Sequence, residues 1–322
     1  MPELRAAVTG STGFIGRHLC AHLSRSGWRV RAILRPTSST PAPERTEQVV
    51  SCLESAALAE HFADCDVVFH LAGLTRAQTF KGFEVANIVA PREVARATKN
   101  AGARLVHVSS LAAGGTGTRS RPRTESDLAA PISAYGRSKL EGERAVRSID
   151  HLDWTVVRPP AVYGPGDRDF LTLVQMARRG LFPQIGRPDA AFSFIYVDDL
   201  VRALGVVARS AKSIDEIYYV DDEKPRSSSE ILNLLAEIFD RAYRPIRVPN
   251  SLLWLFMALG MPAALFGANP LLSPSRYLEI TSKGFVCSST KLRDTTGFKA
   301  QIGLEEGLRR TCDWCTATDD TA

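Results

Sequence analysis

Tyr135 and Lys139 are the residues whose types and spacing most directly indicate chemistry. They lie four residues apart in the predicted helix Pro131–Glu141, so their side chains share one face of that helix. A cation beside a phenol favours the phenolate form, and such a pair can exchange a proton with a bound molecule. The spacing alone is weak evidence, because it often arises by chance. The elements that position the pair must therefore be identified.

A glycine-rich turn at the start of the chain predicts a nucleotide site. It lies between an apolar strand at 4–8 and a helix at 17–26. Gly10 allows the tight turn, Gly13 lets the backbone approach a ligand, and Gly16 lets the helix pack on the strand. The helix N-terminus offers free N–H groups and a positive dipole end to a pyrophosphate. The residues predicted to bind a dinucleotide here are Gly10, Ser11, Thr12, Gly13, Phe14, Ile15 and Gly16.

Apolar runs alternate with helical patterns along the following residues. Strands are predicted at 28–34, 48–53, 66–73, 104–108 and 154–158, with helices at 54–62 and 83–100. Continuous apolar strands are typical of a parallel sheet buried on both faces. The predicted fold class is therefore α/β, a Rossmann-type doubly wound parallel sheet with a smaller α/β C-terminal substrate domain. The predicted division gives 1–165 plus about 193–215 to the NAD(P)-binding domain and 166–192 plus about 216–322 to the substrate domain.

Four motifs in the same order resemble the extended short-chain dehydrogenase/reductase superfamily. They are T-G-x-x-G-x-x-G, the strand D-V-V-F-H-L-A-G, a Ser-Ser strand end and Y-x-x-x-K. That superfamily includes nucleotide-sugar epimerases and dehydratases, 3β-hydroxysteroid dehydrogenases and dihydroflavonol reductases. The segments V-Y-G-P at 162–165 and I-Y-V-D-D-L at 195–200 extend the resemblance. It is specific up to about residue 200 and loose after that.

The resemblance implies hydride transfer with a nicotinamide cofactor. Tyr135 would supply a proton to the developing alkoxide, Lys139 would assist it and hold the nicotinamide ribose, and Ser110 would bind the carbonyl oxygen. Asn87 would support the site through hydrogen bonds, whereas His70 is expected to be a packed strand residue. Further residues at positions that border the cofactor are Leu71, Ala72, Gly73, Ser109 and Pro159.

The end of the second predicted strand bears on the cofactor. An acidic residue there would bind the ribose 2′-hydroxyl of NAD, whereas an arginine accommodates the 2′-phosphate of NADP. The residue is Arg35, and no Asp or Glu lies between Trp28 and Pro43. NADP is therefore expected, with NAD as the alternative. After the third strand, Ser51-Cys52 replaces the usual Gly-Asp pair, so no aspartate is available there to contact adenine.

Two departures from the nucleotide-sugar enzymes bear on the substrate. Those enzymes usually carry Asn after the sixth strand, where this chain has Ala161. They also tend to carry Arg before the Y-V-D-D segment, where this chain has Phe192. The loss of an amide and a guanidinium weakens the case for a diphosphate ligand. The expected function is an NAD(P)-dependent ketone reductase or alcohol dehydrogenase acting on an apolar or lipid-like substrate. The alternatives are a nucleotide-sugar epimerase or dehydratase and a non-catalytic cofactor-binding scaffold.

Charge and composition limit the partners. The 40 basic and 35 acidic residues give a net charge of +5 with no basic tract, so no nucleic-acid partner is expected. The N-terminus lacks the pattern of a secretory signal, which favours a cytoplasmic protein that is a monomer or homodimer. Residues 248–275 carry no charge. The apolar stretch 251–272 is expected to line the substrate site, with contact to a membrane surface as the alternative.

Cysteines and paired aspartates are the remaining candidate ligands. Six cysteines do not make a disulfide framework at this length. Cys312 and Cys315 form C-x-x-C, but no second pair completes a zinc set, so core packing is expected and a redox or metal role is the alternative. Asp198 and Asp199 are expected to cap a helix rather than bind metal. No metal site is predicted.

Overall fold

The computed structural model describes residues 3–77, 79–249, 251–252, 254 and 274–319 of the chain. Within these residues seven parallel strands form the central sheet, in the order β11-β6-β5-β4-β1-β2-β3. Their bounds are β1 (Arg5–Thr9), β2 (Arg29–Leu34), β3 (Glu47–Val50), β4 (Val67–His70), β5 (Arg104–Val108), β6 (Trp154–Arg158) and β11 (Glu216–Tyr219). The strand order reverses between β1 and β4, which is where doubly wound sheets bind ligands. The predicted fold class is confirmed.

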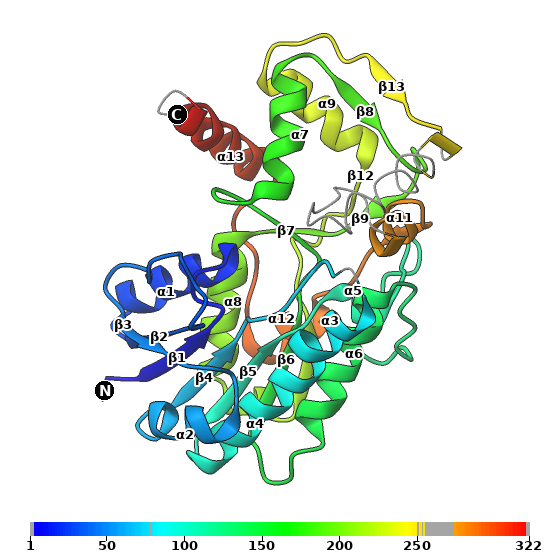
Figure 1. Ribbon diagram of the computed structural model, residues 1–322. Coiled ribbons are helices and arrows are strands. Elements are labelled where there is room, and N and C mark those ends of the chain that lie inside the picture. The colour runs from blue at the N-terminus through cyan, green and yellow to red at the C-terminus, as the bar shows by residue number, and fades with distance from the viewer. Residues whose placement is uncertain (1–2, 78, 250, 253, 255–273, 320–322) are drawn as a thin grey trace.

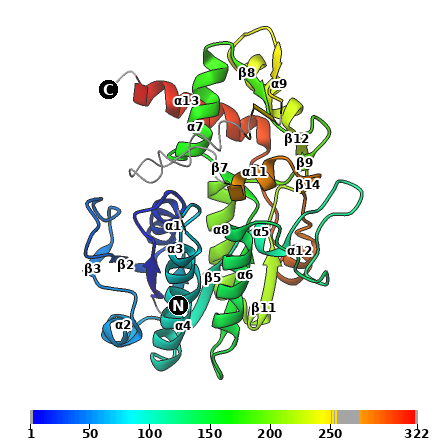
Figure 2. The same cartoon turned by 45° about the vertical axis from the view of Figure 1, so that its right-hand side comes forward.

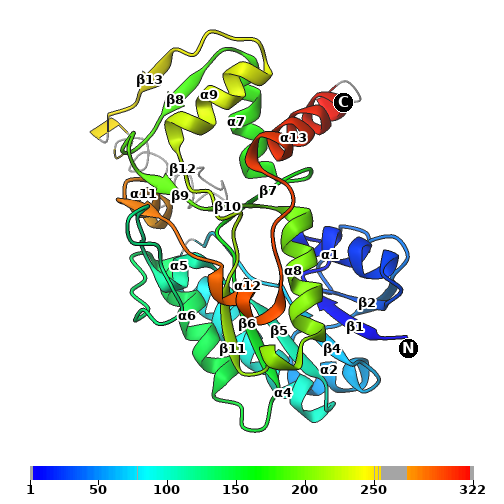
Figure 3. The same cartoon turned by 180° about the vertical axis from the view of Figure 1, so that it is seen from behind.

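Helices cover both faces of this sheet (Figures 1 and 3). One face carries α1 (Phe14–Arg25), α8 (Val197–Arg209) and α12 (Thr290–Thr296). The other carries α2 (Ser55–Phe62), α4 (Ala90–Asn100) and α6 (Ala134–Arg147), and α4 and α6 lie side by side (Figure 2). Two short helices complete this layer: α3 (Phe80–Glu84), which continues through a π-helical segment (Val85–Val89) into α4, and α5 (Leu111–Gly114) after β5.

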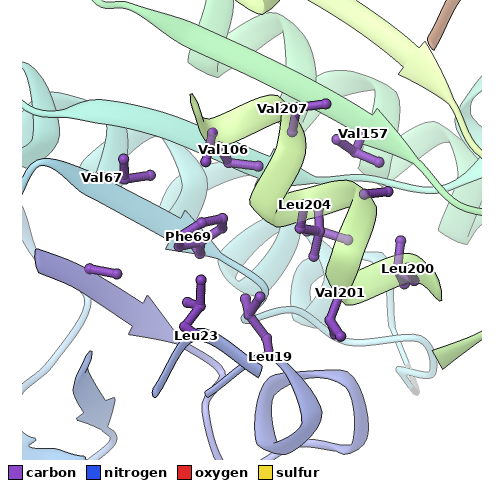
Figure 4. Close-up of a cluster of buried hydrophobic side chains, with 14 of the residues drawn as sticks. Leu19, Leu23, Val67, Phe69, Val106, Val157, Leu200, Val201, Leu204 and Val207 are labelled. Carbon is purple, nitrogen blue, oxygen red and sulfur yellow. The ribbon is translucent and has the colours of Figure 1, made fainter. Parts of the chain in front are cut away.

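The alternation of side chains along the strands fixes these two layers. Ala6 and Val8 of β1 point to the α1/α8 side, whereas Ala7 between them points to the α2/α4/α6 side. Figure 4 shows the first cluster, in which Leu19 of α1 and Leu204 of α8 lie among the side chains of the sheet. Because both faces are buried, the strands can be apolar throughout, as the sequence pattern predicted.

One strand lies outside its predicted domain. Residues 216–219, which were predicted to belong to the substrate domain, form β11 at the edge of the central sheet. Glu216–Tyr219 pairs in parallel with Thr155–Arg158 of β6, and Tyr218 and Tyr219 are fully buried there. The sequence of these four residues does not indicate that β6 is their partner, because about sixty residues, including the helix α7 (Arg168–Arg178), separate the two strands. The rest of the predicted division stays a prediction.

The smaller part of the molecule, here called the cap, lies beyond the carboxyl edge of the sheet (Figure 1). The chain leaves the sheet through β7 (Ala161–Tyr163) and returns through β10 (Phe194–Tyr196), which pairs with it. The cap consists of α7 (Arg168–Arg178), β8 (Phe182–Gln184), β9 (Ala191–Phe192), β12 (Arg226–Ser227), α9 (Ser228–Ile238), β13 (Pro245–Arg247), α11 (Pro274–Ile280), β14 (Gly284–Phe285) and α13 (Leu304–Asp319). A separate apolar cluster that includes Phe182, Leu235 and Leu308 holds α7, β8, β9, α9 and α13 together.

The C-x-x-C cysteines belong to this cluster. Cys312 and Cys315 are both buried on α13, and burial raises the pKa of Cys312 to about 12. A thiol with so high a pKa is a poor nucleophile and metal ligand at neutral pH. Across the described ranges, no three His, Cys, Asp or Glu side chains gather in a way that could hold a metal ion.

Most of the apolar stretch 251–272 lies outside the described residues. In the part of the chain that is described, none of the helices has the length and apolar character needed to cross a bilayer. The cytoplasmic location and the oligomeric state stay predictions.

Candidate active site

A cavity of about 580 Å³ lies at the carboxyl edge of the sheet, between the sheet and the cap. On the sheet side its wall includes Phe14, Ile15, Leu71, Gly73, Asn87, Ser109, Ser110, Tyr135, Lys139 and Pro159. On the cap side it includes Phe170, Leu173, Phe192, Glu279, Ile280 and Phe285. Residues from four separate sequence motifs therefore meet at one place. Ser110, Tyr135 and Lys139, predicted to be catalytic, all line this cavity.

The other predicted cofactor residues lie outside the described cavity wall. Gly10 has a φ of +72°, and a Cβ there would lie 2.7 Å from the backbone nitrogen of Ala72. A Cβ on Gly16 would lie 2.1 Å from the carbonyl oxygen of Gly10. Only glycine fits either place, which explains the spacing of the motif. Ser11 is fully buried and its hydroxyl donates to the carbonyl of Ile33, so this side chain serves packing.

The first turn of α1 is suited to an anion. The helix begins at Phe14, three residues earlier than predicted, and its N-cap residue Gly13 provides no side-chain cap. The first turn holds no acidic residue. Backbone N–H groups and the positive dipole end are thus available for a pyrophosphate. The uncapped turn and the two glycine contacts fit the dinucleotide that the sequence predicted.

Arg17 is a residue that the sequence interpretation missed. Its guanidinium donates from Nε to the carbonyl of Thr12 at 3.3 Å and from Nη2 to the carbonyl of Pro41 at 3.0 Å. It thereby links the glycine turn to the loop after β2, where Arg35 is exposed. The feature of the sequence that could have indicated this role is a basic residue directly after Gly16, the last glycine of the turn.

Lys139 is held in a defined position beneath the cavity. Its side chain is buried, and Nζ donates to the carbonyl of Val108 at 2.8 Å. Burial lowers the pKa of Lys139 to about 8, an effect that the nearby Glu143 carboxylate opposes. Tyr135 lies one turn earlier on α6, and Ser133 caps this helix by accepting from the backbone N–H of Gly136 at 2.9 Å.

The two serines at the end of β5 differ in their contacts. Ser110 Oγ accepts from the backbone N–H of Ala112 at 3.1 Å and caps α5. This leaves its O–H group as a donor toward the cavity. Ser109, predicted to border the cofactor, donates its hydroxyl to buried Glu143 instead. Its contact with the cavity therefore does not include a free donor.

A buried ion pair lies behind these serines and was not predicted. Arg158 at the end of β6 donates to Glu143 from Nε at 2.9 Å and from Nη2 at 2.6 Å. Its Nη1 donates to the hydroxyl of Tyr219 on β11 at 2.9 Å. Both charged side chains are at most 5% exposed. The pair therefore joins α6, β6 and β11, and through Ser109 it reaches the end of β5.

Asn87 makes the kind of contacts that were expected of it. It is buried in the π-helical segment, and such segments are frequent at functional sites. Its Oδ1 accepts from the backbone N–H of Leu74, and its Nδ2 donates to the carbonyl of Leu74 and to Ser138 Oγ, all at 2.9 Å. Asn87 thereby ties the loop after β4 to α6. Its role in activity stays a prediction.

His70 is a packed residue of β4. It is fully buried, its Nδ1 lies 2.7 Å from Thr9 Oγ1, and its ring stacks on His107 at 5.4 Å. Burial lowers the pKa of His70 to about 3, so the ring is neutral at physiological pH.

The prediction that Asp198 and Asp199 cap a helix is wrong. They lie in the first turn of α8, whose N-cap residue is Tyr196, and neither side chain caps it. Asp199 instead accepts from the backbone N–H groups of Gln301 and Ile302 at 2.9 and 2.8 Å, because this buried carboxylate faces the segment leading to α13. Asp198 contacts His18 of α1.

A doubly wound sheet with a glycine turn before its first helix and a Tyr–Lys pair over its carboxyl edge defines a nucleotide-binding enzyme of the extended short-chain dehydrogenase/reductase fold. The model of the NAD dependent epimerase/dehydratase family matches residues 6–220, and the chain belongs to this family. It is therefore an NAD-dependent oxidoreductase or epimerase.

Relatives of both kinds are found. Ceramide reductase of Caulobacter vibrioides is 31% identical over 316 residues, which cover 97% of this chain and 94% of the relative. UDP-glucose 4-epimerase of Vibrio cholerae is 26% identical over 323 residues, which cover 94% and 93%. The solved structure of MoeE5 in complex with UDP-glucuronic acid and NAD has a TM-score of 0.77 at 24% identity, covering 98% of this chain and 99% of that one. This structural similarity supports the fold.

Proposed function

We propose that the protein is an NADPH-dependent ketone reductase that acts on an apolar, lipid-like substrate. The cap side of the cavity carries this proposal, because its described wall is mainly apolar. Aromatic and aliphatic side chains from α7, β9, α11 and β14 make up that wall: Phe170, Leu173, Phe192, Ile280 and Phe285. Such a surface stabilises a bound hydrocarbon group by burying it and offers few hydrogen-bond partners to a sugar.

The charges around the cavity argue against a diphosphate substrate. The charged residues in its described wall are Lys139, Asp167 and Glu279, and no arginine is among them. A diphosphate would face two carboxylates, whereas sites for phosphates normally present arginine. A neutral ketone meets no such repulsion. The similarity to ceramide reductase over 97% of the chain favours the same conclusion.

The residues divide the reaction among themselves. When bound, the nicotinamide supplies a hydride to the carbonyl carbon of the substrate. Tyr135 donates a proton to the carbonyl oxygen as negative charge develops there. Lys139, held by the carbonyl of Val108, places positive charge beside this proton transfer. Ser110 donates a hydrogen bond to the same oxygen, since its acceptor side is already used by Ala112.

The preference for NADPH rests on the loop after β2. Arg35 is exposed at the end of this strand, and the next acidic residue along the chain is Glu44. Arg17 holds the same loop through the carbonyl of Pro41. In our proposal Arg35 contacts the 2′-phosphate, because a guanidinium matches a phosphate and no carboxylate competes for it.

The test combines a substrate comparison with one substitution. Tyr135→Phe should remove at least 99% of NADPH-dependent reduction of long-chain ketones and leave NADPH affinity within about twofold, since the loss of a general acid costs roughly 10²–10⁴ in rate. Tyr218→Phe, on β11 away from the cavity, is the matched control and should keep its activity. Full activity of Tyr135→Phe would refute the assignment.

The second candidate is a nucleotide-sugar epimerase, which the similarity to the Vibrio cholerae enzyme favours. Titration of the binary complex with UDP-glucose separates the two. Tight binding of UDP-glucose together with NAD retained through purification would make the epimerase the better assignment. NADPH preference that is lost in Arg35→Asp, with no response to the sugar, would support the reductase.

A further inference from the structure

One side of the cap carries arginines and exposed apolar side chains together. It consists of the end of α7 with the residues before β8 (178–181) and of β13 with its flanks (241–249, 251–252 and 254), here called the cap edge. Figures 1 and 3 show β8 and β13 running together along this side. All three residues of β13 are exposed, and Ile246 is 53% exposed. Trp254 is 57% exposed, whereas Trp28 and Trp154 are buried.

The charge of the cap edge has one sign. Its two segments contain five arginines and no acidic residue; the nearest acidic residue in sequence is Asp240. All five arginines are exposed: Arg178, Arg179, Arg241, Arg244 and Arg247. Among the described residues, Arg241, Arg244 and Arg247 have no ion-pair partner, whereas exposed Arg96, Arg144 and Arg309 each pair with an acid three or four residues away. Their charge is therefore available to an external anion.

The two segments form one surface. β8 and β13 pair in parallel with Phe182 opposite Pro245, so Leu181 and Arg244, which precede these residues, are neighbours. Leu181 is 43% exposed and Leu252 is 40% exposed. Arginine and proline on an edge strand also discourage pairing with another sheet, but that role does not account for an exposed tryptophan. Exposed apolar side chains beside unpaired cations match an interface that is anionic at its surface and apolar beneath.

We propose that the cap edge docks on the surface of a membrane that contains anionic phospholipids. The arginines lie at the level of the phosphates, and Trp254, Leu252 and Ile246 enter the interfacial layer. Helix α7 connects this surface to the cavity, because its residues Phe170 and Leu173 line the cavity and its last turn reaches Arg178. A lipid-like substrate would then be taken up at the side of the cap that faces the bilayer.

The docking is a separate claim from the proposed reaction. It depends on the surface alone, and it can be measured without cofactor, substrate or turnover. If the protein binds vesicles but does not reduce ketones, the docking inference stands and the proposed function is refuted. If it reduces ketones but does not bind vesicles, the proposed function stands and the docking inference is refuted.

The experiment is co-sedimentation of the full chain with large unilamellar vesicles of phosphatidylcholine, with and without 30% phosphatidylglycerol. We expect binding to the anionic vesicles that weakens as salt rises, and little binding to phosphatidylcholine alone. Arg244→Gln with Arg247→Gln should weaken binding by roughly 25-fold, since each cation near such a surface contributes about fivefold. Lys212→Gln with Lys299→Gln removes the same charge from exposed places on the sheet domain and should leave binding within about twofold.

Tryptophan fluorescence checks that the apolar residues enter the lipid. Anionic vesicles should shift the emission to shorter wavelength in the wild type. Trp254→Ser should abolish the shift, because Trp28 and Trp154 are buried and Trp314 of α13 is packed against the apolar cluster of the cap. Equal binding by the arginine and lysine variants would overturn the proposal. So would a dimer in sedimentation that Trp254→Ser dissociates, because a second copy would then cover the cap edge.

Discussion

The buried pair Glu143–Arg158 offers the sharpest test of how the catalytic helix is held. Glu143 is fully buried and accepts three hydrogen bonds, one from Ser109 and two from Arg158. Glu143→Gln keeps the shape of the side chain but removes its charge. Arg158 would then be a buried cation without a counterion, and Lys139 would lose the carboxylate that lies near it on α6.

The magnitude follows from these contacts. Removing one partner of a buried ion pair typically costs about 3–5 kcal/mol, because the remaining charge stays desolvated. The amide oxygen of glutamine still accepts one hydrogen bond, and Arg158 keeps its bond to Tyr219. We therefore expect a loss near the lower end, about 3 kcal/mol. Since the Glu143 carboxylate raises the pKa of Lys139, its removal should also move that pKa below about 8.

Urea unfolding of the cofactor-free protein measures the first effect, and the pH profile of kcat measures the second. Glu141→Gln is the matched control on the same helix: its ion pair with Arg144 is exposed and contributes at most about 0.5 kcal/mol. Arg158→Met with Glu143→Met should recover part of the lost stability, because it removes both buried charges. Equal stability of Glu143→Gln and Glu141→Gln, with an unchanged pH profile, would refute the reasoning.

Three further predictions test other parts of the structure. Gly16→Ala places a Cβ 2.1 Å from the carbonyl oxygen of Gly10, so we expect a loss of roughly 1–3 kcal/mol in thermal unfolding and more than tenfold weaker NADPH binding by titration. Burial lowers the pKa of Lys139 to about 8 in the folded protein, so kcat should fall above pH 8 as this side chain loses its charge. Between pH 8 and about 10.5 the lysine binds fewer protons in the folded state than in the unfolded state, so stability to urea should rise with pH in that range. A thiol reagent at pH 7.5 should modify exposed Cys52 first and buried Cys312 only on unfolding, which mass spectrometry of the labelled peptides can follow.

The parts of the site that the sequence predicted are those whose function depends on neighbours within one turn. The glycine spacing reports a local steric demand, and the close approach of Gly16 to the carbonyl of Gly10 shows that demand directly. Tyr135 and Lys139 share a helix face because of their spacing alone. The order of these motifs then predicted the parallel sheet, since each one ends a strand or begins the following helix.

The parts that were missed depend on residues far apart in the chain. Arg158 reads from the sequence as the last residue of an apolar strand, and nothing local indicates that Glu143 neutralises it. The placement of β11 depends on pairing with β6, about sixty residues earlier. Ser109 lines the cavity, and its place beside the cofactor stays a prediction, but nothing in the sequence indicates that a carboxylate from α6 engages its hydroxyl. A single sequence does not indicate such contacts, because the stabilisation depends on which distant residue the fold brings next to each side chain.

The choice between a lipid-like ketone and a nucleotide sugar as substrate depends both on residues that the sequence singles out and on contacts that only the fold shows. Ala161 and Phe192 were singled out in the sequence as departures from the nucleotide-sugar enzymes, and both line the cavity. The sequence could not place Glu279 on the same cavity wall, because α11 lies more than eighty residues further along the chain than Phe192. Ser133, the cap of the catalytic helix, donates to Glu279 at 2.6 Å, which holds this carboxylate against the wall. A guanidinium restored at 192 would therefore share the cavity wall with the carboxylate of Glu279. In our proposal this combination, more than any single departure, disfavours a diphosphate.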